Sequence, residues 1–258
     1  MVKQPSEQRY AAKFPKSKAL FERAQGTFPR GVSHDGWYVS PFPIFMTKAK
    51  GSHVWDVDGY DYIDYYGGHG GKMLGHAHPA VVEAAKKQIE NGIQYGSCCD
   101  LSLEWAELIK RLVPSAERLE FTNSGTEAVM MGIRMARAFT GRSKIVRFQY
   151  HFAGGYDAVL VGYRKPFDLP ISAGLLPATI ENTIVIPSNN EQALEDSLRK
   201  RDVAALIVEA AGSSSGVDGI KPSFYQTMRD LTTKYDSLLF FDEVITGFRY
   251  SPGGVQQL

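Results

Sequence analysis

The second half of the chain alternates apolar runs with segments that have helical spacing, from about residue 117 onward. Unbroken apolar runs are typical of strands covered on both faces. The pattern therefore predicts strands at Leu119–Thr122, Lys144–Phe148, Thr183–Pro187, Val203–Glu209 and Leu238–Glu243, with helices at Ser124–Phe139, Glu191–Arg199 and Pro222–Lys234. Repeated βα units of this kind predict an α/β fold whose sheet is mainly parallel and is wrapped by helices.

The first part of the chain has shorter segments. A helix is predicted at Lys18–Ala24, followed by a loop over residues 31–43 and by an antiparallel segment with strands at Ile44–Met46, His53–Asp56 and Tyr62–Tyr65. Two more helices are predicted, from Pro79 to about Asn91 and over Ser102–Leu112. We therefore predict two parts, an amino-terminal segment of residues 1–66 and a larger domain of residues 67–258.

Composition excludes several classes of partner. Lys and Arg number 29 and Asp and Glu 28, so no charge excess favours nucleic acid or an anionic membrane. The amino terminus lacks an apolar signal core, and no run approaches the roughly 20 apolar residues that cross a bilayer. The two cysteines, Cys98 and Cys99, are adjacent, which suits a reducing compartment. We expect a soluble cytoplasmic protein without nucleic-acid or membrane partners.

Polar residues follow three of the predicted strands. Asp242 and Glu243 end the last apolar strand, Glu209 ends the strand before it, and Tyr150 and His151 follow Lys144–Phe148. In open α/β sheets, ligands bind outside the carboxyl ends of the strands. Simpler interpretations remain open, because a strand-terminal Asp often caps a turn and an aromatic residue at this position often only packs.

A fourth candidate lies between Leu119–Thr122 and the helix after it, at Ser124, Gly125, Thr126 and Glu127. Unpaired amides and the dipole of a helix start attract anions, and small hydroxyl residues suit phosphate oxygens. Ser124 and Glu127 also match a capping box, and the two interpretations are compatible. Together with the strand-end residues, this segment predicts a site for a phosphorylated aromatic cofactor with a basic ring nitrogen.

Three histidines, His69, His76 and His78, lie in or after the glycine-dense segment of residues 67–71. Zinc ligands are normally fixed on defined elements, whereas a glycine run separates these candidates. We therefore predict no metal site. The same glycine run lacks the strand and helix context of a phosphate loop, which disfavours a nucleotide-binding domain.

The motifs taken together resemble those of the class III aminotransferases of pyridoxal-phosphate fold type I, and among them glutamate-1-semialdehyde 2,1-aminomutase and its relatives. The resemblance rests on Ser124–Glu127, Tyr150–His151, the strand ending at Glu209, Phe241–Arg249, Trp55–Asp64 and Leu74–Pro79. It implies amino-group transfer through aldimine and ketimine intermediates on pyridoxal 5'-phosphate. It also implies a small amino-acid or amino-ketone substrate and a homodimer with the active site at the interface.

The resemblance also implies roles for single residues. Asp242 would pair with the ring nitrogen of the cofactor, and Val244 and Tyr150 would contact its two faces. Ser124, Gly125 and Thr126 would bind the phosphate, with Glu209 and His151 close to the ring. Ser33 would contact substrate, and His69 would line the substrate pocket. Ser33 and His69 are given these roles because they occupy the corresponding positions of the family pattern.

Three departures from the family pattern are visible. His69 stands where relatives tend to have an aromatic residue, and Ala210 where proline usually follows the glutamate. The Schiff-base lysine and a small carboxy-terminal domain are expected beyond Leu258, since Lys221 and Lys234 do not match the lysine position. We expect the amino-terminal part of an aminotransferase or aminomutase. The alternative is a non-catalytic cofactor-binding or assembly subunit whose partner supplies the lysine.

Overall fold

The computed structural model describes residues 6–212, 216 and 219–258. Contacts divide the chain into two compact units, Met1–Ser97 and Cys98–Leu258, and each is described by itself. This division falls later than the predicted boundary between residues 66 and 67. The reason is local: the backbone of His76 pairs with Gly51, and its Nε2 lies 2.6 Å from Asp64, so the segment after residue 66 packs with the first unit.

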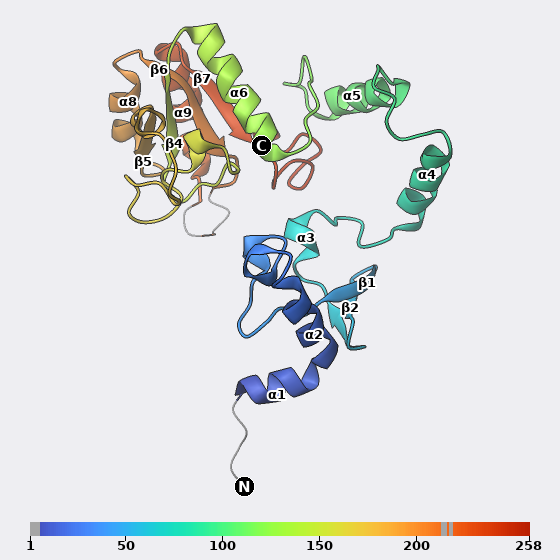
Figure 1. The fold of residues 1–258 in the computed structure, drawn as a ribbon. Helices are drawn as coiled ribbons and strands as arrows, with labels where there is room; N and C mark the ends of the chain where they lie inside the picture. The colour runs from blue at the N-terminus through green and yellow to red at the C-terminus, as the bar shows by residue number, and fades with distance from the viewer. Residues whose placement is uncertain (1–5, 213–215, 217–218) are drawn as a thin grey trace. The chain divides into compact units, whose positions relative to one another are not determined.

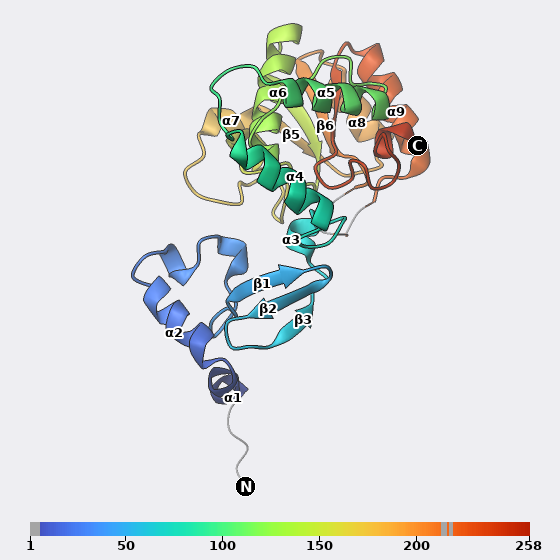
Figure 2. The same ribbon diagram turned by 90° about the vertical axis from the view of Figure 1, so that its right-hand side faces the viewer.

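The first unit contains a three-stranded antiparallel sheet in the order β1-β2-β3 (Figure 2). Its elements are α1 (Ser6–Lys13), α2 (Pro15–Ala24), η1 (Pro29–Gly31), η2 (Asp35–Trp37), β1 (Met46–Lys50), β2 (His53–Asp56), β3 (Asp61–Ile63), α3 (Gly67–Gly70) and α4 (Pro79–Glu90). The predicted antiparallel segment is confirmed. The prediction missed α1, which buries none of its residues fully and packs through Tyr10 and Ala11 alone against the cluster of Phe14, Phe21 and Phe42.

One turn of the antiparallel sheet is tied to α2 by the carboxylate of Asp58. It accepts hydrogen bonds from the backbone N–H groups of Lys16 and Ser17 at 2.7 and 3.0 Å, and from the Ser17 hydroxyl at 2.7 Å. Amides in the first turn of a helix lack partners inside the helix. Asp58 therefore acts as the capping group of α2 from a distant part of the chain, which explains why the helix begins at Pro15 and not at Lys18.

The second unit has a parallel sheet, in the order β5-β4-β6-β7 among the described residues. Its elements are α5 (Asp100–Leu112), α6 (Gly125–Thr140), β4 (Lys144–Phe148), η3 (Asp157–Val159), α7 (Pro177–Glu181), β5 (Thr183–Ile186), α8 (Glu191–Leu198), β6 (Val203–Glu209), α9 (Pro222–Lys234), β7 (Leu238–Asp242) and η4 (Val255–Gln257). The predicted α/β fold with a parallel sheet is confirmed.

Helices cover both faces of this sheet, with α6 on one face and α8 and α9 on the other (Figure 1). Every residue of β6 is buried, as expected for a central strand. On the α6 face the packed side chains are Val129, Ile133, Ile145 and Ile207. On the opposite face they are Leu194, Leu198, Leu206, Val208, Phe224 and Met228, with Val146 and Phe148.

The predicted strand at Leu119–Thr122 is wrong, because these residues form no ladder in the described structure. The ring of Phe121 stacks instead on Trp105 of α5, with centroids 4.2 Å apart and planes at 12°. No described strand pairs with the outer edge of β7, and an apolar cavity lies there instead, lined in part by Phe139, Leu239 and Phe240. A run of strand-forming residues becomes a strand only where a neighbouring edge pairs with it, and no described strand does so here.

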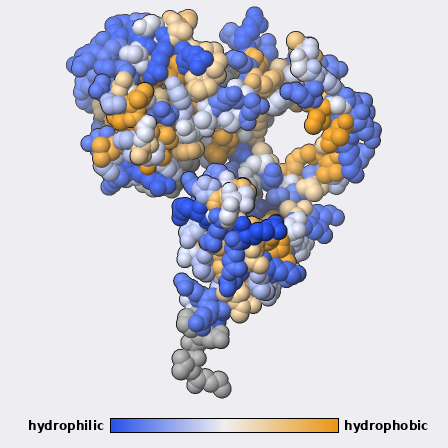
Figure 3. Space-filling view, viewed as in Figure 1, coloured by the Kyte–Doolittle hydropathy of each residue, from blue (hydrophilic) through white to orange (hydrophobic). Residues whose placement is uncertain are grey.

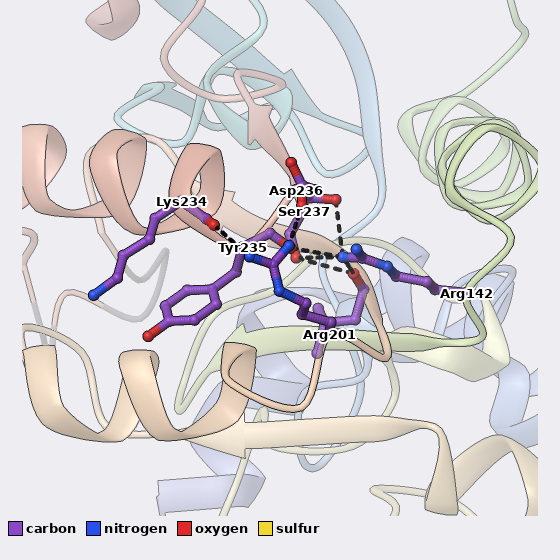
Figure 4. A network of polar contacts seen from close by, with 7 residues as sticks. Arg142, Arg201, Lys234, Tyr235, Asp236 and Ser237 are labelled. Carbon is purple, nitrogen blue, oxygen red and sulfur yellow. Dashed lines mark hydrogen bonds and ion pairs between the residues drawn. The ribbon is translucent and has the colours of Figure 1, made fainter.

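Polar contacts hold the amino ends of β6 and β7 together (Figure 4). The Nη1 of Arg142 lies 2.9 and 2.8 Å from the carbonyl oxygens of Tyr235 and Asp236, and 3.2 Å from that of Val203. Arg201 pairs with the carboxylate of Asp236. Because charge-assisted hydrogen bonds are stronger than neutral ones, this cluster is a structural anchor at the end of the sheet opposite the predicted site.

Candidate active site

The carboxyl ends of β4, β6 and β7 and the start of α6 meet at one edge of the second unit. Glu209 and Asp242 are paired residues of the neighbouring strands β6 and β7. Two residues beyond Asp242, the side chain of Val244 lies so close to Gly125 that a Cβ there would be 2.8 Å from Val244 Cγ2. The predicted convergence of these segments is therefore a feature of the structure.

The start of α6 offers two unpaired amides. Ser124 is the N-cap, and its Oγ accepts a hydrogen bond from the N–H of Glu127 at 3.2 Å, while Glu127 Oε2 accepts from the N–H of Asn123 at 2.7 Å. The Ser124 half of the predicted capping box is thus formed, whereas Glu127 binds the amide of Asn123, one residue before the N-cap, and not that of Ser124. The N–H groups of Gly125 and Thr126 have no partner among the described residues. They leave an anion-binding position at the positive end of a helix of 16 residues.

A second loop is fastened to this helix start. The Oγ1 of Thr126 accepts a hydrogen bond from the N–H of Gly155 at 3.0 Å. At the neighbouring Gly154 the backbone is left-handed, with φ of 89°, and an added Cβ would lie 2.5 Å from Thr126 Oγ1. Only glycine fits this close approach. The segment after β4 is thereby held against the anion-binding amides.

The carboxyl group of Asp242 is half-buried and only partly satisfied. Its Oδ1 accepts a hydrogen bond from the N–H of Val244 at 3.0 Å, and its Oδ2 has no partner among the described residues. Burial raises the pKa of Asp242 above its ordinary value, while the hydrogen bond from Val244 and, after it, the Arg147 charge act in the opposite direction. A carboxylate in such a position gains stability from a cationic ligand.

The adjacent acid, Glu243, faces a different part of the chain. Its carboxylate accepts hydrogen bonds from the Thr246 hydroxyl and from the N–H groups of Val255 and Gln256, the last two at 3.1 and 2.9 Å. Glu243 therefore stabilises the turns over residues 246–257. The two carboxylates at the end of β7 have separate roles, which their adjacency in sequence conceals.

His151 is buried, with 2% of its surface exposed, and it connects β4 to β6. Its Nδ1 accepts a hydrogen bond from the N–H of Glu209 at 3.0 Å, and its carbonyl oxygen accepts one from Nη2 of Arg147. Burial, together with the Arg147 charge, lowers the pKa of His151 to about 3. The imidazole is neutral at physiological pH, and it positions Glu209 instead of transferring protons.

This depressed pKa predicts a specific pH dependence of stability. The folded state favours neutral His151, so its contribution is complete above the ordinary pKa of 6.5 and is lost as the pH falls toward 3. We expect the free energy of unfolding of the native protein to decline relative to a His151→Gln variant by about 1.4 kcal/mol per pH unit in that range. Urea unfolding of both proteins between pH 7 and 4 measures the difference. A constant difference would contradict the prediction.

Two aromatic side chains follow β4, and only one was predicted. The ring of Tyr150 packs edge to face on Phe167 with centroids 4.7 Å apart, and its N–H donates to the carbonyl of Gly162 at 2.8 Å. Phe152 is 42% exposed, and its N–H donates to Glu209 Oε2 at 2.7 Å. The structure therefore places Phe152 beside the acidic strand ends. The two rings have different partners, Phe167 for Tyr150 and Tyr163 for Phe152, and the backbone at Tyr150 is left-handed, with φ of 66°.

The predicted substrate residues lie in the first unit. Ser33 is exposed and precedes His34, whose ring lies 6.1 Å from that of His69. The hydroxyl of Tyr66 is 2.6 Å from Nε2 of His69. His34, which sequence reasoning did not select, follows Ser33 in the chain and is the residue whose ring contacts His69. The contact of Ser33 and His69 with substrate stays a prediction.

The sequence predicts that neither Lys221 nor Lys234 is the Schiff-base lysine, and both make other contacts in the structure. The Nζ of Lys234 lies 2.7 Å from Oε1 of Glu195, and Lys234 is the last residue of α9, close to Tyr235 and Asp236 (Figure 4). Asp242 is at the other end of the strand that follows, β7. Lys221 is the N-cap of α9, and its N–H donates to Oδ1 of Asn189 at 2.7 Å.

Among the described residues, no helix combines the length and apolarity that a membrane crossing requires.

An acid at a strand end beside a helix start with unpaired amides, on an open parallel sheet, is the position at which α/β proteins bind ligands. The family model of the class-III aminotransferases matches residues 36–254. The chain belongs to this family. The glutamate-1-semialdehyde 2,1-aminomutase of Methanocella arvoryzae is 43% identical over 245 residues, which are 93% of this chain and 58% of that protein. The chain thus spans less than two thirds of this relative.

Solved structures agree with this assignment. An omega-transaminase from Sphaerobacter thermophilus superimposes with a TM-score of 0.89 and 32% identity over 93% of this chain and 57% of that one. A transaminase with PLP bound gives the same TM-score and identity over 95% of this chain and 58% of its own. The resemblance to fold type I aminotransferases is therefore confirmed at the level of fold and family.

Proposed function

We propose that the complete native protein is a pyridoxal-phosphate-dependent aminotransferase or aminomutase that acts on a small amino acid or amino ketone. The observation that carries the proposal is the incomplete hydrogen bonding of Asp242, set beside the unpaired amides of Gly125 and Thr126. A phosphate and a protonated ring nitrogen on one ligand would satisfy both. The relatives named as aminomutase and transaminase support the same chemistry.

The residues present fit the cofactor. Gly125 and Thr126 would donate backbone N–H groups to its phosphate, with Ser124 fixing the helix start. Asp242 would accept a hydrogen bond from the ring nitrogen. Val244, which is 63% exposed and lies against Gly125, would contact one face of the ring. When bound, the protonated ring acts as an electron sink for a carbanion at the substrate Cα.

Phe152 is our candidate for the opposite face of the ring, in place of Tyr150. Its ring is exposed and lies edge to face against Tyr163, with centroids 5.3 Å apart, and its backbone is anchored on Glu209. Tyr150, in contrast, contacts Phe167. Glu209 would orient the loop that carries Phe152, since its carboxylate binds that backbone directly. His151 would keep Glu209 in place without exchanging a proton at neutral pH.

The partner of the proposed enzyme is a second copy of the chain. Both α4 and α5 bury none of their residues, although each carries apolar side chains, and Figure 3 shows apolar surface along them. The exposed residues include Val81 and Ile89 of α4 and Leu103, Trp105 and Leu108 of α5. Large exposed apolar patches mark interaction surfaces. A homodimer in the cytoplasm, as in the family resemblance, would cover them.

The proposal is tested on the complete native protein by equilibrium dialysis with pyridoxal 5'-phosphate and by an assay of keto-acid formation from a panel of amino acids. We expect saturable binding of one cofactor per chain, amino-group transfer from at least one substrate, and a dimer in analytical ultracentrifugation. Isomerisation of a single substrate without an acceptor would assign the aminomutase reaction. Failure to bind the cofactor would overturn the proposal.

A further inference from the structure

A buried arginine lies beneath the proposed site. Arg147 of β4 has 1% of its surface exposed, and its register partner on β6 is Ile207. Side chains two residues apart on a strand share one face of the sheet. Arg147 and Ile207 therefore share a face with Glu209 and with its register partner Asp242, each one pleat further toward the carboxyl end.

The guanidinium group of Arg147 extends toward that end of the sheet. Its Nη2 donates to the carbonyl oxygen of His151, which lies beyond the end of β4. Its Nε and Nη1 are buried and have no hydrogen-bond partner among the described residues. A buried cation with unsatisfied donors is costly for a fold, so this hydrogen bond alone does not explain an arginine here. An apolar residue would pack at the position without that cost.

The charges around Arg147 indicate what it does. Glu209 and Asp242 are its anionic neighbours, and burial lowers its pKa to about 10 while their charges oppose that shift. It therefore remains a cation at neutral pH. His151 also contacts Arg147, but its imidazole is neutral at this pH and adds no charge. Glu243, next to Asp242 in sequence, binds the turns over residues 246–257 instead. Val129 and Ile133 of α6 cover this face of the sheet with apolar atoms.

Arg147 is one cation beside two carboxyl groups, Glu209 and Asp242, and a protonated ring nitrogen would add a second cation to the cluster. We infer that Arg147 is a positioning residue that offsets the charge of Glu209 and keeps Asp242 ionised for the cofactor ring nitrogen. This inference rests on the proposed function. Arg147 acts through Asp242 and does not itself contact the cofactor.

The test measures cofactor affinity of the complete native protein against pH, by equilibrium dialysis with pyridoxal 5'-phosphate. Affinity is lost at low pH when Asp242 becomes protonated. In Arg147→Met the pH midpoint of this loss should rise by about one unit, the lower end of the effect that a nearby opposite charge has on a carboxyl pKa. Arg147→Lys, which keeps the charge, should leave the midpoint near that of the native protein.

Arg142→Met is the matched control. Arg142 lies at the opposite end of the same strands, where its donors bind the carbonyls of Tyr235 and Asp236. Its loss should lower the unfolding temperature without moving the pH midpoint. If Arg147→Met does not fold, Arg147→Gln, which retains a donor for His151, takes its place. An unchanged midpoint in a folded, uncharged variant would overturn the inference, while binding by the native protein would still uphold the proposed function.

Discussion

Replacing Asp242 by Asn is expected to lower amino-group transfer by the complete native protein about 100-fold or more. The carboxyl group is half-buried, and its Oδ2 is available to a cationic ligand. Removing one partner of a buried charge pair costs about 3 kcal/mol or more, and each 1.4 kcal/mol is a factor of ten in rate. Steady-state kinetics at saturating pyridoxal 5'-phosphate measures the loss, and dialysis measures the accompanying drop in cofactor affinity.

The control for this variant is the neighbouring acid. Glu243→Gln removes a charge one residue away, but its carboxylate binds Val255 and Gln256 and not the predicted ligand position. We expect this variant to retain cofactor affinity within a few-fold and to lose stability in the 246–257 turns. Equal losses of activity in the two variants would show that the site does not depend on Asp242 in particular.

Replacing Gly154 by Ala is expected to destabilise the second unit by about 2–4 kcal/mol and to weaken phosphate binding. An added Cβ would lie 2.5 Å from Oγ1 and 2.8 Å from Cα of Thr126, and the backbone is left-handed. Overpacking costs about 1–3 kcal/mol, and the left-handed backbone adds about 1 kcal/mol. The loop would have to move away, which breaks the hydrogen bond from Gly155 to Thr126.

Gly155 gives the matched comparison. An added Cβ at Gly155 would meet nothing within 4 Å, and its backbone is not left-handed. Gly155→Ala should therefore unfold in urea at nearly the native midpoint, whereas Gly154→Ala should unfold well below it. Dialysis with pyridoxal 5'-phosphate should rank the affinities in the same order. Similar midpoints for the two variants would mean that the loop adapts without cost.

The sequence by itself determined the βα order of the second unit and the ends of its central strands. Val203–Glu209 is an apolar run that ends in one acid, and Lys144–Phe148 combines Ile145, Val146 and Phe148 with two basic residues. Both strands can be recognised from their own β-forming residues. The cap at Ser124 is equally local, since it depends on a side chain and an amide three residues away. Because parallel strands end on one side, the position of the candidate site followed as well.

Only the tertiary structure decided which of the strand-end residues face that site. Asp242 and Glu243 are adjacent in sequence, and their separation depends on amides of residues 255 and 256 that Glu243 binds. The choice between Tyr150 and Phe152 depends on their contacts, with Phe167 for Tyr150 and with Glu209 from another strand for Phe152. The role of Arg147 depends on the register of three strands. Leu119–Thr122 is apolar enough for a strand but finds no described edge to pair with, because pairing is a non-local property.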